Sequence, residues 1–245
     1  MLHNPTKLYT HHVANLRELE TALTNTSRIA REAIASRDHQ KSLRTLLRMY
    51  AFLIGAWAET RLCKLLHEES GFDATERAII QGKSTQFEQW QQAMDLAFRK
   101  HHGVKKAKLD ERSLGVDYAA RRDALHGVLA NELRIIIEIR NKLAHGQWIY
   151  PLNNAGTAVE TEKFRLINQE NLLSLQLKYS LIEHLANAVH DLVVSPHAFK
   201  RDFESHYKKL LQVRTNLVTK KYEKYEAMLV KSHQRARSRL AEASL

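Results

Sequence analysis

Residues 134–150 read RIIIEIRNKLAHGQWIY, an apolar helix that runs into a glycine. Isoleucines at 135, 136, 137 and 139, followed by Leu143, leave this helix little polar surface, so it is expected to be buried on more than one side. Gly146 favours the end of the helix, because glycine adopts the left-handed conformation at little cost. We therefore predict a central helix at about 118–145, with the rest of the chain packed around it.

Arg140, Asn141 and His145 are the polar residues of interest in this segment. At about 100° per residue, Arg140 lies beside the apolar line of the helix, Asn141 points away from it, and His145 sits about 140° from Arg140. Arg140 and His145 therefore do not meet on one ideal helix. Shared chemistry would require an unwound helix end, the reach of the long arginine, or a second copy of the segment facing the first.

Helix capping alone could account for the end of this segment. A histidine in the last turn complements the helix dipole, and a glycine after it terminates the helix. The spacing of five residues between an arginine and a histidine is also not specific, since it recurs at Arg121 and His126 and again at Arg201 and His206.

The surrounding sequence distinguishes the copy at 140–145. The string RNKLAHG, after a helix and before QWIYPLN, resembles the signature of the HEPN superfamily, in which an arginine and a polar residue precede a histidine about five residues after the arginine. Many HEPN domains also carry an aromatic and acidic pair in an early helix. Trp57 and Glu59, in the segment AFLIGAWAETRLCKLL at 51–66, match that pair. The resemblance covers about residues 41–195.

The resemblance implies an all-α fold: a HEPN-like helical bundle with a small β-hairpin insertion after the motif helix. It further implies a homodimer with a composite active site and a metal-independent endoribonuclease that needs no cofactor. His145 would then act as general acid or base, Arg140 would stabilise phosphoryl charge, and Asn141 would orient the phosphate or the histidine. Lys142 and Tyr150 are candidate RNA contacts. Family members often act as toxins of toxin–antitoxin pairs or in phage defence, which would add an antitoxin or regulatory partner protein.

Glu59 lies on a second apolar strip of a long helix expected at 41–69. A carboxylate buried there requires a partner, and Arg140 is the candidate. The alternative is that Glu59 faces solvent and is bonded to nothing.

Composition favours a mostly helical protein that can bury a substantial core, because the 245 residues include only 8 Gly and 3 Pro. The single cysteine excludes an internal disulfide and suits a reducing compartment. Neither a signal segment nor an apolar run long enough to cross a bilayer is present, so we expect a soluble, cytoplasmic protein without membrane contact.

The formal net charge of +11 favours a polyanionic partner, most simply RNA. Residues 196–245 alone contain 12 Lys and Arg against 5 acidic residues. We expect 1–195 to form the HEPN-like domain and 196–245 a basic helical extension. The candidate RNA-binding residues lie in a basic loop at 99–112 and in this extension: Lys105, Lys106, Lys108, Lys220, Lys221, Arg235, Arg237 and Arg239.

The remaining periodic segments predict further helices, joined by turns and a hairpin. A hairpin is expected at about 147–168, with its turn at Asn153 to Gly156. The predicted helices lie at 6–23, from Thr26 or Ser27 to about 35, after a cap at Asp73 or Thr75, at 85–101, at 169–194 and at 197–231.

Other chemistry finds little support in the sequence. The string QGKST at 81–85 lacks the upstream glycine of a phosphate-binding loop, and the paired histidines lack the spacing of a zinc site, so no metal is expected. Two non-catalytic functions remain open: an RNA-binding or dimerising adaptor of HEPN type, and a purely structural helical protein in which His145 is only a cap.

Overall fold

The computed structural model describes residues 7–37 and 40–242. Within these ranges the regular structure is helical and no strand forms. The helices are α1 (Lys7–Ser36), α2 (Gln40–Leu66), α3 (Ala74–Gln81), α4 (Gln86–His102), α5 (Glu111–Leu114), α6 (Val116–Val128), the π-helical turn η1 (Leu129–Leu133), α7 (Arg134–Ala144), α8 (Thr161–Gln169), α9 (Leu172–Val194), α10 (Pro196–Thr219) and α11 (Tyr222–Glu242). The prediction of an all-α protein is confirmed.

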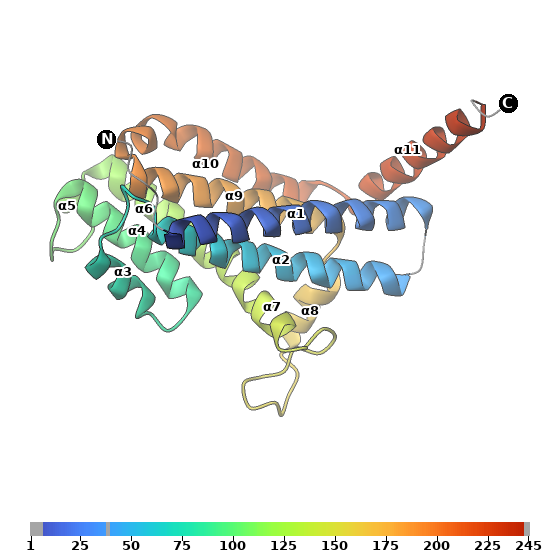
Figure 1. Ribbon diagram of the computed structural model, residues 1–245, viewed down its shortest axis with the longest axis horizontal. Helices are drawn as coiled ribbons and strands as arrows, with labels where there is room; N and C mark the ends of the chain where they lie inside the picture. Colours follow the sequence, from blue (N-terminus) through green and yellow to red (C-terminus); the bar gives the residue numbers. More distant parts are fainter. Residues whose placement is uncertain (1–6, 38–39, 243–245) are drawn as a thin grey trace.

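Two long helical hairpins form the body of the molecule. Figure 1 shows α1 beside α2 and α9 beside α10, with the two pairs packed against each other. Apolar residues recur along α2 and α9 at the spacing of a buried helix face, which is why these helices pack as a bundle. The buried side chains along this face include Ile54, Leu62, Leu65, Leu185, Val189 and Leu192.

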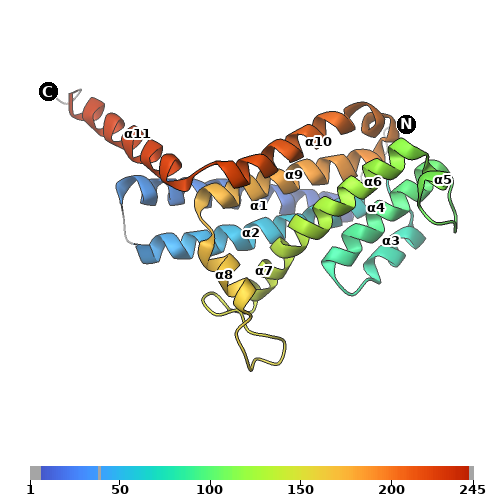
Figure 2. The ribbon, with the colours of Figure 1, turned by 180° about the vertical axis from the view of Figure 1, so that it is seen from behind.

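The predicted central helix exists as one oblique rod made of α6, η1 and α7 (Figure 2). It runs from residue 116 to 144, close to the expected 118–145. Its π-helical turn interrupts the regular α-helix at Leu129–Leu133. Ile136, Ile137, Ile139 and Leu143 are all buried, so the rod packs on more than one side as the isoleucine run predicts.

Side-chain caps define the helices at one end of the bundle. The Asp73 side chain accepts a hydrogen bond from the Glu76 backbone N–H, and the Glu76 carboxylate accepts one from the Asp73 backbone N–H, so one of the two expected caps is confirmed. Thr85 and Glu88 form the same reciprocal arrangement at the start of α4. Each arrangement satisfies backbone N–H groups that the first helical turn leaves without partners.

The expected hairpin at 147–168 is replaced by a short looped turn and a helix. An isolated bridge joins Leu152 to Val159, and the predicted turn is present, with the Gly156 amide 2.9 Å from the Asn153 carbonyl oxygen. From Thr161 the chain forms α8 in place of a second strand. A helix is favoured here because Ile167 is buried when the segment is helical, whereas an isolated hairpin would bury little apolar surface.

The N-terminal segment is a single helix, where two had been expected. Thr26 and Ser27, predicted to cap a second helix, lie within α1 and are buried. Ser27 instead accepts a hydrogen bond from the Gln176 amide of α9, 2.9 Å away. A partner in the tertiary structure thus replaces the local capping role of this hydroxyl.

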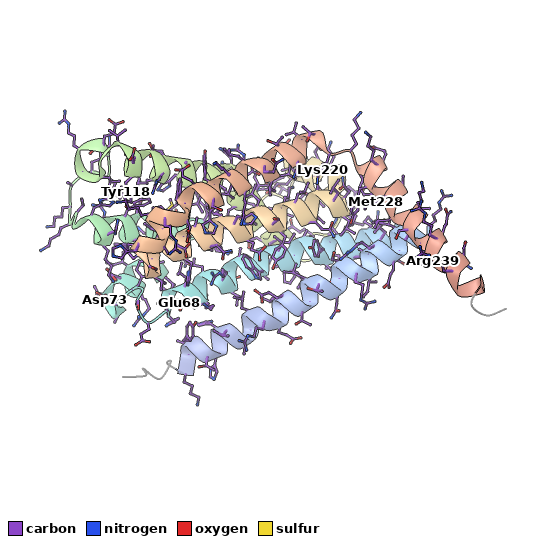
Figure 3. The ribbon with its side chains drawn as sticks, turned by 90° about the horizontal axis from the view of Figure 1, so that it is seen from above. Glu68, Asp73, Tyr118, Lys220, Met228 and Arg239 are labelled. Atoms are coloured by element: carbon purple, nitrogen blue, oxygen red, sulfur yellow. The ribbon has the colours of Figure 1, made fainter. Side chains whose placement is uncertain are left out.

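The C-terminal segment divides into two helices, where one had been expected at 197–231. α10 packs along α9 and buries Phe199, Phe203 and Leu210 in the core. Lys220 adopts an extended conformation between α10 and α11. The extension expected from residue 196 therefore consists of a core helix and α11, which crosses the end of α1 and projects from the body (Figures 1 and 3).

Candidate active site

The candidate site begins where α7 crosses α2 at Gly55. A Cβ atom at Gly55 would lie 2.3 Å from Cβ and 2.7 Å from Cγ of Arg140. These separations are shorter than van der Waals contact, so only glycine allows the two helices to approach so closely. The crossing holds the Arg140 side chain against α2.

Arg140 is held by two neighbours at this crossing. Its Nη2 forms an ion pair with Glu59, one turn after Gly55 on α2, and its Nη1 donates to Asn141 Oδ1 at 2.9 Å. The ion pair expected between Glu59 and Arg140 is therefore confirmed. The Arg140 side chain is 22% exposed and that of Glu59 46%, so part of the pair faces solvent.

Burial has two consequences for the Arg140 guanidinium. It lowers the pKa of Arg140 from its ordinary value, although an arginine remains charged at neutral pH. It also covers the Nε atom, which has no hydrogen-bond partner among the described residues. The guanidinium is thus a fixed positive group with part of its hydrogen-bonding capacity unused.

His145 occupies the C-terminal end of α7. Its amide donates to the Asn141 carbonyl at 3.2 Å, and Gly146 follows with a positive φ of 75°. The helix thus ends as the histidine and glycine predict. The His145 side chain is exposed, and in the described part of the chain its imidazole forms no hydrogen bond or ion pair. It likewise has no bond to Arg140 within one chain, in agreement with their angular separation on the helix.

The histidines of the other two arginine–histidine pairs are engaged with carboxylates. His126 lies 2.8 Å from Asp95, and His206 lies 3.1 Å from Asp191. Both are part-buried, and both join one helix to another. His145 therefore differs from them in being exposed and without such a partner in the described chain.

Arg48, which is not among the site residues predicted from the sequence, fixes the loop that follows the motif. This arginine of α2 is 4% exposed. It donates to the carbonyl of Trp148 at 3.1 Å, to that of Ile167 at 2.5 Å and to the Asn168 side chain at 2.9 Å. The Trp148 indole in turn donates to the Leu143 carbonyl at 3.0 Å. Arg48 could have been identified from the sequence, because it lies seven residues before Gly55 and therefore on the same face of the helix.

Lys142 and Tyr150, the other predicted contacts near the motif, have different environments. Lys142 lies 2.5 Å from Glu160 and donates to the Leu152 carbonyl, and its side chain is only 12% exposed. Lys142 therefore holds the loop that follows α7 against the end of this helix. Tyr150 is exposed and stacks on Phe164 with ring centroids 5.6 Å apart, which leaves its other face accessible.

The predicted RNA-binding residues lie apart from Arg140 along the chain's surface. Lys105, Lys106 and Lys108 are exposed in the loop between α4 and α5, remote from the loop that follows α7 (Figure 2). Lys220 and Lys221 are exposed at the break between α10 and α11. Arg235, Arg237 and Arg239 are exposed on the projecting part of α11, where Figure 3 labels Arg239.

Three observations complete the description. In the described residues, no three His, Cys, Asp or Glu side chains come together in a way that could hold a metal ion. Among the described helices, none combines the length and apolar character needed to span a bilayer. Comparison with protein-family models, with curated proteins and with solved structures found no match to this chain.

Proposed function

We propose that this protein is a metal-independent endoribonuclease of HEPN type that acts as a homodimer. The observation that carries the proposal is the Arg140 guanidinium, held by Glu59 and Asn141 at the α2–α7 crossing, on the same helix end as the exposed His145. A fixed positive fork and a titratable imidazole are the groups that phosphoryl transfer without a metal requires.

The proposed reaction is attack by a ribose 2′-oxygen on the adjacent phosphorus. The bond from the 2′-oxygen to phosphorus forms and the bond from phosphorus to the 5′-oxygen breaks, which leaves a 2′,3′-cyclic phosphate and a 5′-hydroxyl. One proton leaves the 2′-hydroxyl and one is added to the 5′-oxygen. His145 performs one of these transfers, and Arg140 stabilises the charge that develops on the phosphoryl oxygens.

The homodimer in this proposal supplies what one chain lacks. Since Arg140 and His145 are not joined within a chain, a second copy would bring two such pairs to one RNA strand. A role as a toxin or phage-defence effector in the cytoplasm, with an antitoxin or other regulatory partner, remains part of the proposal through the family resemblance alone.

The test is cleavage of a mixed RNA in EDTA by the wild-type chain, Arg140→Ala and His145→Ala, each checked for folding. Arg201→Ala is a matched control, because this exposed arginine has the same spacing to a histidine. We expect cyclic-phosphate products from the wild type and the control only. DNA should stay intact, because it lacks the attacking hydroxyl, and comparable DNA cleavage would refute the mechanism.

A non-catalytic RNA-binding adaptor is the second candidate. It is favoured because no group among the described residues orients the His145 imidazole, whereas a general base is ordinarily held by a third residue. RNA binding with a steep salt dependence, no cleavage, and equal affinity in all four proteins would establish this function. If no RNA is bound at all, the motif serves only to end and anchor α7.

A further inference from the structure

α11 separates two grooves of different character. One side of the helix borders a groove of about 680 Å³ together with the start of α9. Lys220, Lys221 and Lys224 lie along this groove, which we call the lysine groove. Glu223 and Glu226 border the other groove, on the opposite side of α11. Three lysines therefore gather on one side of the start of α11, whereas Glu223 and Glu226 lie on the other side together with Lys231.

The lysine groove is held in place by hydrogen bonds. The Tyr225 hydroxyl of α11 donates to the Gln176 side chain of α9 at 3.0 Å. Gln176 donates in turn to Ser27 of α1 at 2.9 Å. Because these bonds join three helices, the groove is formed before any ligand arrives, and little ordering is needed for binding.

The floor of the lysine groove is largely aliphatic. Leu173 and Leu177 of α9 line it together with Met228 of α11, which is 57% exposed (Figure 3). Exposed apolar side chains beside a groove are typical of a protein-binding surface. Methionine suits such a surface because its flexible side chain adapts to the groups that it contacts.

Three lysines surround this floor. None of Lys220, Lys221 and Lys224 forms an ion pair with a carboxylate among the described residues. The groove therefore presents three adjacent positive charges over apolar surface, a combination that attracts negative charge and rewards the burial of apolar groups.

We propose that the lysine groove binds an acidic amphipathic segment of a partner protein. Apolar side chains of the segment would cover Leu173, Leu177 and Met228, while its carboxylates would face the three lysines. A second copy of this chain is the less favoured occupant, since the proposed homodimer joins two copies at the α7 motif and not at this groove. Single-stranded RNA is the less favoured occupant, because bases stack on aromatic rings and Tyr225 is the single aromatic residue among the described residues that line the groove.

This inference does not depend on RNA cleavage and is tested by binding alone. The probe is a fluorescein-labelled helical peptide of about 16 residues, with leucines at helical spacing and glutamates elsewhere, followed by fluorescence anisotropy with the full chain. A second peptide has the same charge but serine in place of leucine. The test variant combines Lys220→Glu, Lys221→Glu and Lys224→Glu. Its control combines Arg235→Glu, Arg237→Glu and Arg239→Glu, which makes the same change in charge farther along α11.

We expect saturable binding of the leucine peptide to the wild-type chain. The affinity should fall at least about tenfold in the lysine variant and less than about twofold in the control variant. The serine peptide should bind the wild-type chain much more weakly than the leucine peptide does. Met228→Glu should weaken binding without altering the lysines. The proposal is overturned by no saturable binding, by equal binding of the two peptides, or by equal loss in both variants. Displacement of the peptide by oligouridylate would instead assign the groove to RNA, as expected from sequence for Lys220 and Lys221. A smaller sedimenting species in the lysine variant would assign it to a second copy.

Discussion

Gly55 shows how one residue can determine the position of a side chain in the candidate site. Its missing Cβ provides the space that the Arg140 stem occupies. Glu59 follows by one helical turn and therefore faces the same neighbour, which places its carboxylate beside the guanidinium. The geometry of the candidate site is thus set by a helix contact and not by a loop.

Gly55→Ala should destabilise the protein and displace Arg140. The added methyl group would overlap the Arg140 stem, so we expect a loss of about 1–3 kcal/mol in the free energy of unfolding, measured with urea. Gly127→Ala is the control, because a Cβ at Gly127 meets no atom within 4 Å. This substitution should raise stability by about 0.5–1 kcal/mol, as expected for alanine within a helix. Equal effects of the two substitutions would refute the close-packing argument.

Arg48→Met should loosen the loop that follows the motif. It would leave the carbonyl oxygens of Trp148 and Ile167 without their donor, at a cost of about 2–4 kcal/mol in unfolding free energy. Trp148 fluorescence and amide hydrogen exchange in residues 146–152 should both report greater mobility. Arg44→Met, an exposed change one turn earlier, should alter stability by less than about 0.5 kcal/mol. Unchanged exchange in Arg48→Met would show that this arginine does not position the loop.

Individual helices in this protein end or continue according to their tertiary partners. α6 and α7 are continuous through a π-helical turn, in which each backbone hydrogen bond spans one residue more than in the α-helix. Glu132 in this turn lies 3.3 Å from Arg214 of α10, and burial raises the pKa of its carboxyl. The turn therefore links the central rod to α10, a connection that helical periodicity alone does not reveal.

Glu68 should make the joint between α2 and α9 sensitive to acid. Burial by itself would raise the pKa of this carboxyl, but hydrogen bonds from His190 and Lys64 outweigh burial and hold the pKa at about 2. A carboxyl with a lowered pKa contributes its full stabilisation above its unfolded value of about 4.5 and loses it as the pH falls toward 2. Glu68→Gln should therefore cost on the order of 2 kcal/mol at pH 7 and almost nothing near pH 2.

The measurement for Glu68 is the unfolding free energy of both proteins across this pH range. Glu18→Gln serves as the control, since it changes an exposed carboxyl of α1. A Glu68→Gln deficit that stayed constant from pH 7 to pH 2 would show that the ionised carboxylate is not what stabilises the joint.

The whole molecule combines a bundle with a projecting basic helix. The bundle buries the apolar faces of α2, α7, α9 and α10, whereas the far part of α11 extends away from it (Figure 1). The exposed arginines of α11 can therefore contact a polyanion without rearrangement of the core.

Replacement of Arg235, Arg237 and Arg239 by alanine should weaken RNA binding through electrostatics alone. Loss of three phosphate contacts should reduce the slope of log K against log salt by about 2 for a single strand. Anisotropy of labelled oligouridylate across a salt series gives this slope. The control replaces three exposed cations elsewhere, Arg17, Arg28 and Lys83, by alanine. The same reduction in both proteins would mean that α11 is not a specific RNA contact.

The fold class and most of the long helices could be predicted from sequence, since each shows a clear apolar periodicity. The segments at 41–69, 85–101, 118–145 and 169–194 all correspond to observed helices. The pairing of Glu59 with Arg140 was also predictable, because a carboxylate on an apolar strip needs a cation. These features depend on local spacing and on the cost of burying charge.

The tertiary structure alone decided the features that depend on partners distant in sequence. Ser27 lies within a helix because Gln176 donates a hydrogen bond to its hydroxyl. Arg48 can be buried because Trp148, Ile167 and Asn168 accept its hydrogen bonds. Residues 161–169 form the helix α8 because Ile167 is then buried in the core. The amino-acid sequence by itself determined the helical periodicity, the end of α7 at Gly146 and the excess positive charge. The joints between helices, and the position of each charge relative to them, were decided by packing, since the groups that satisfy a buried polar atom come from elsewhere in the chain.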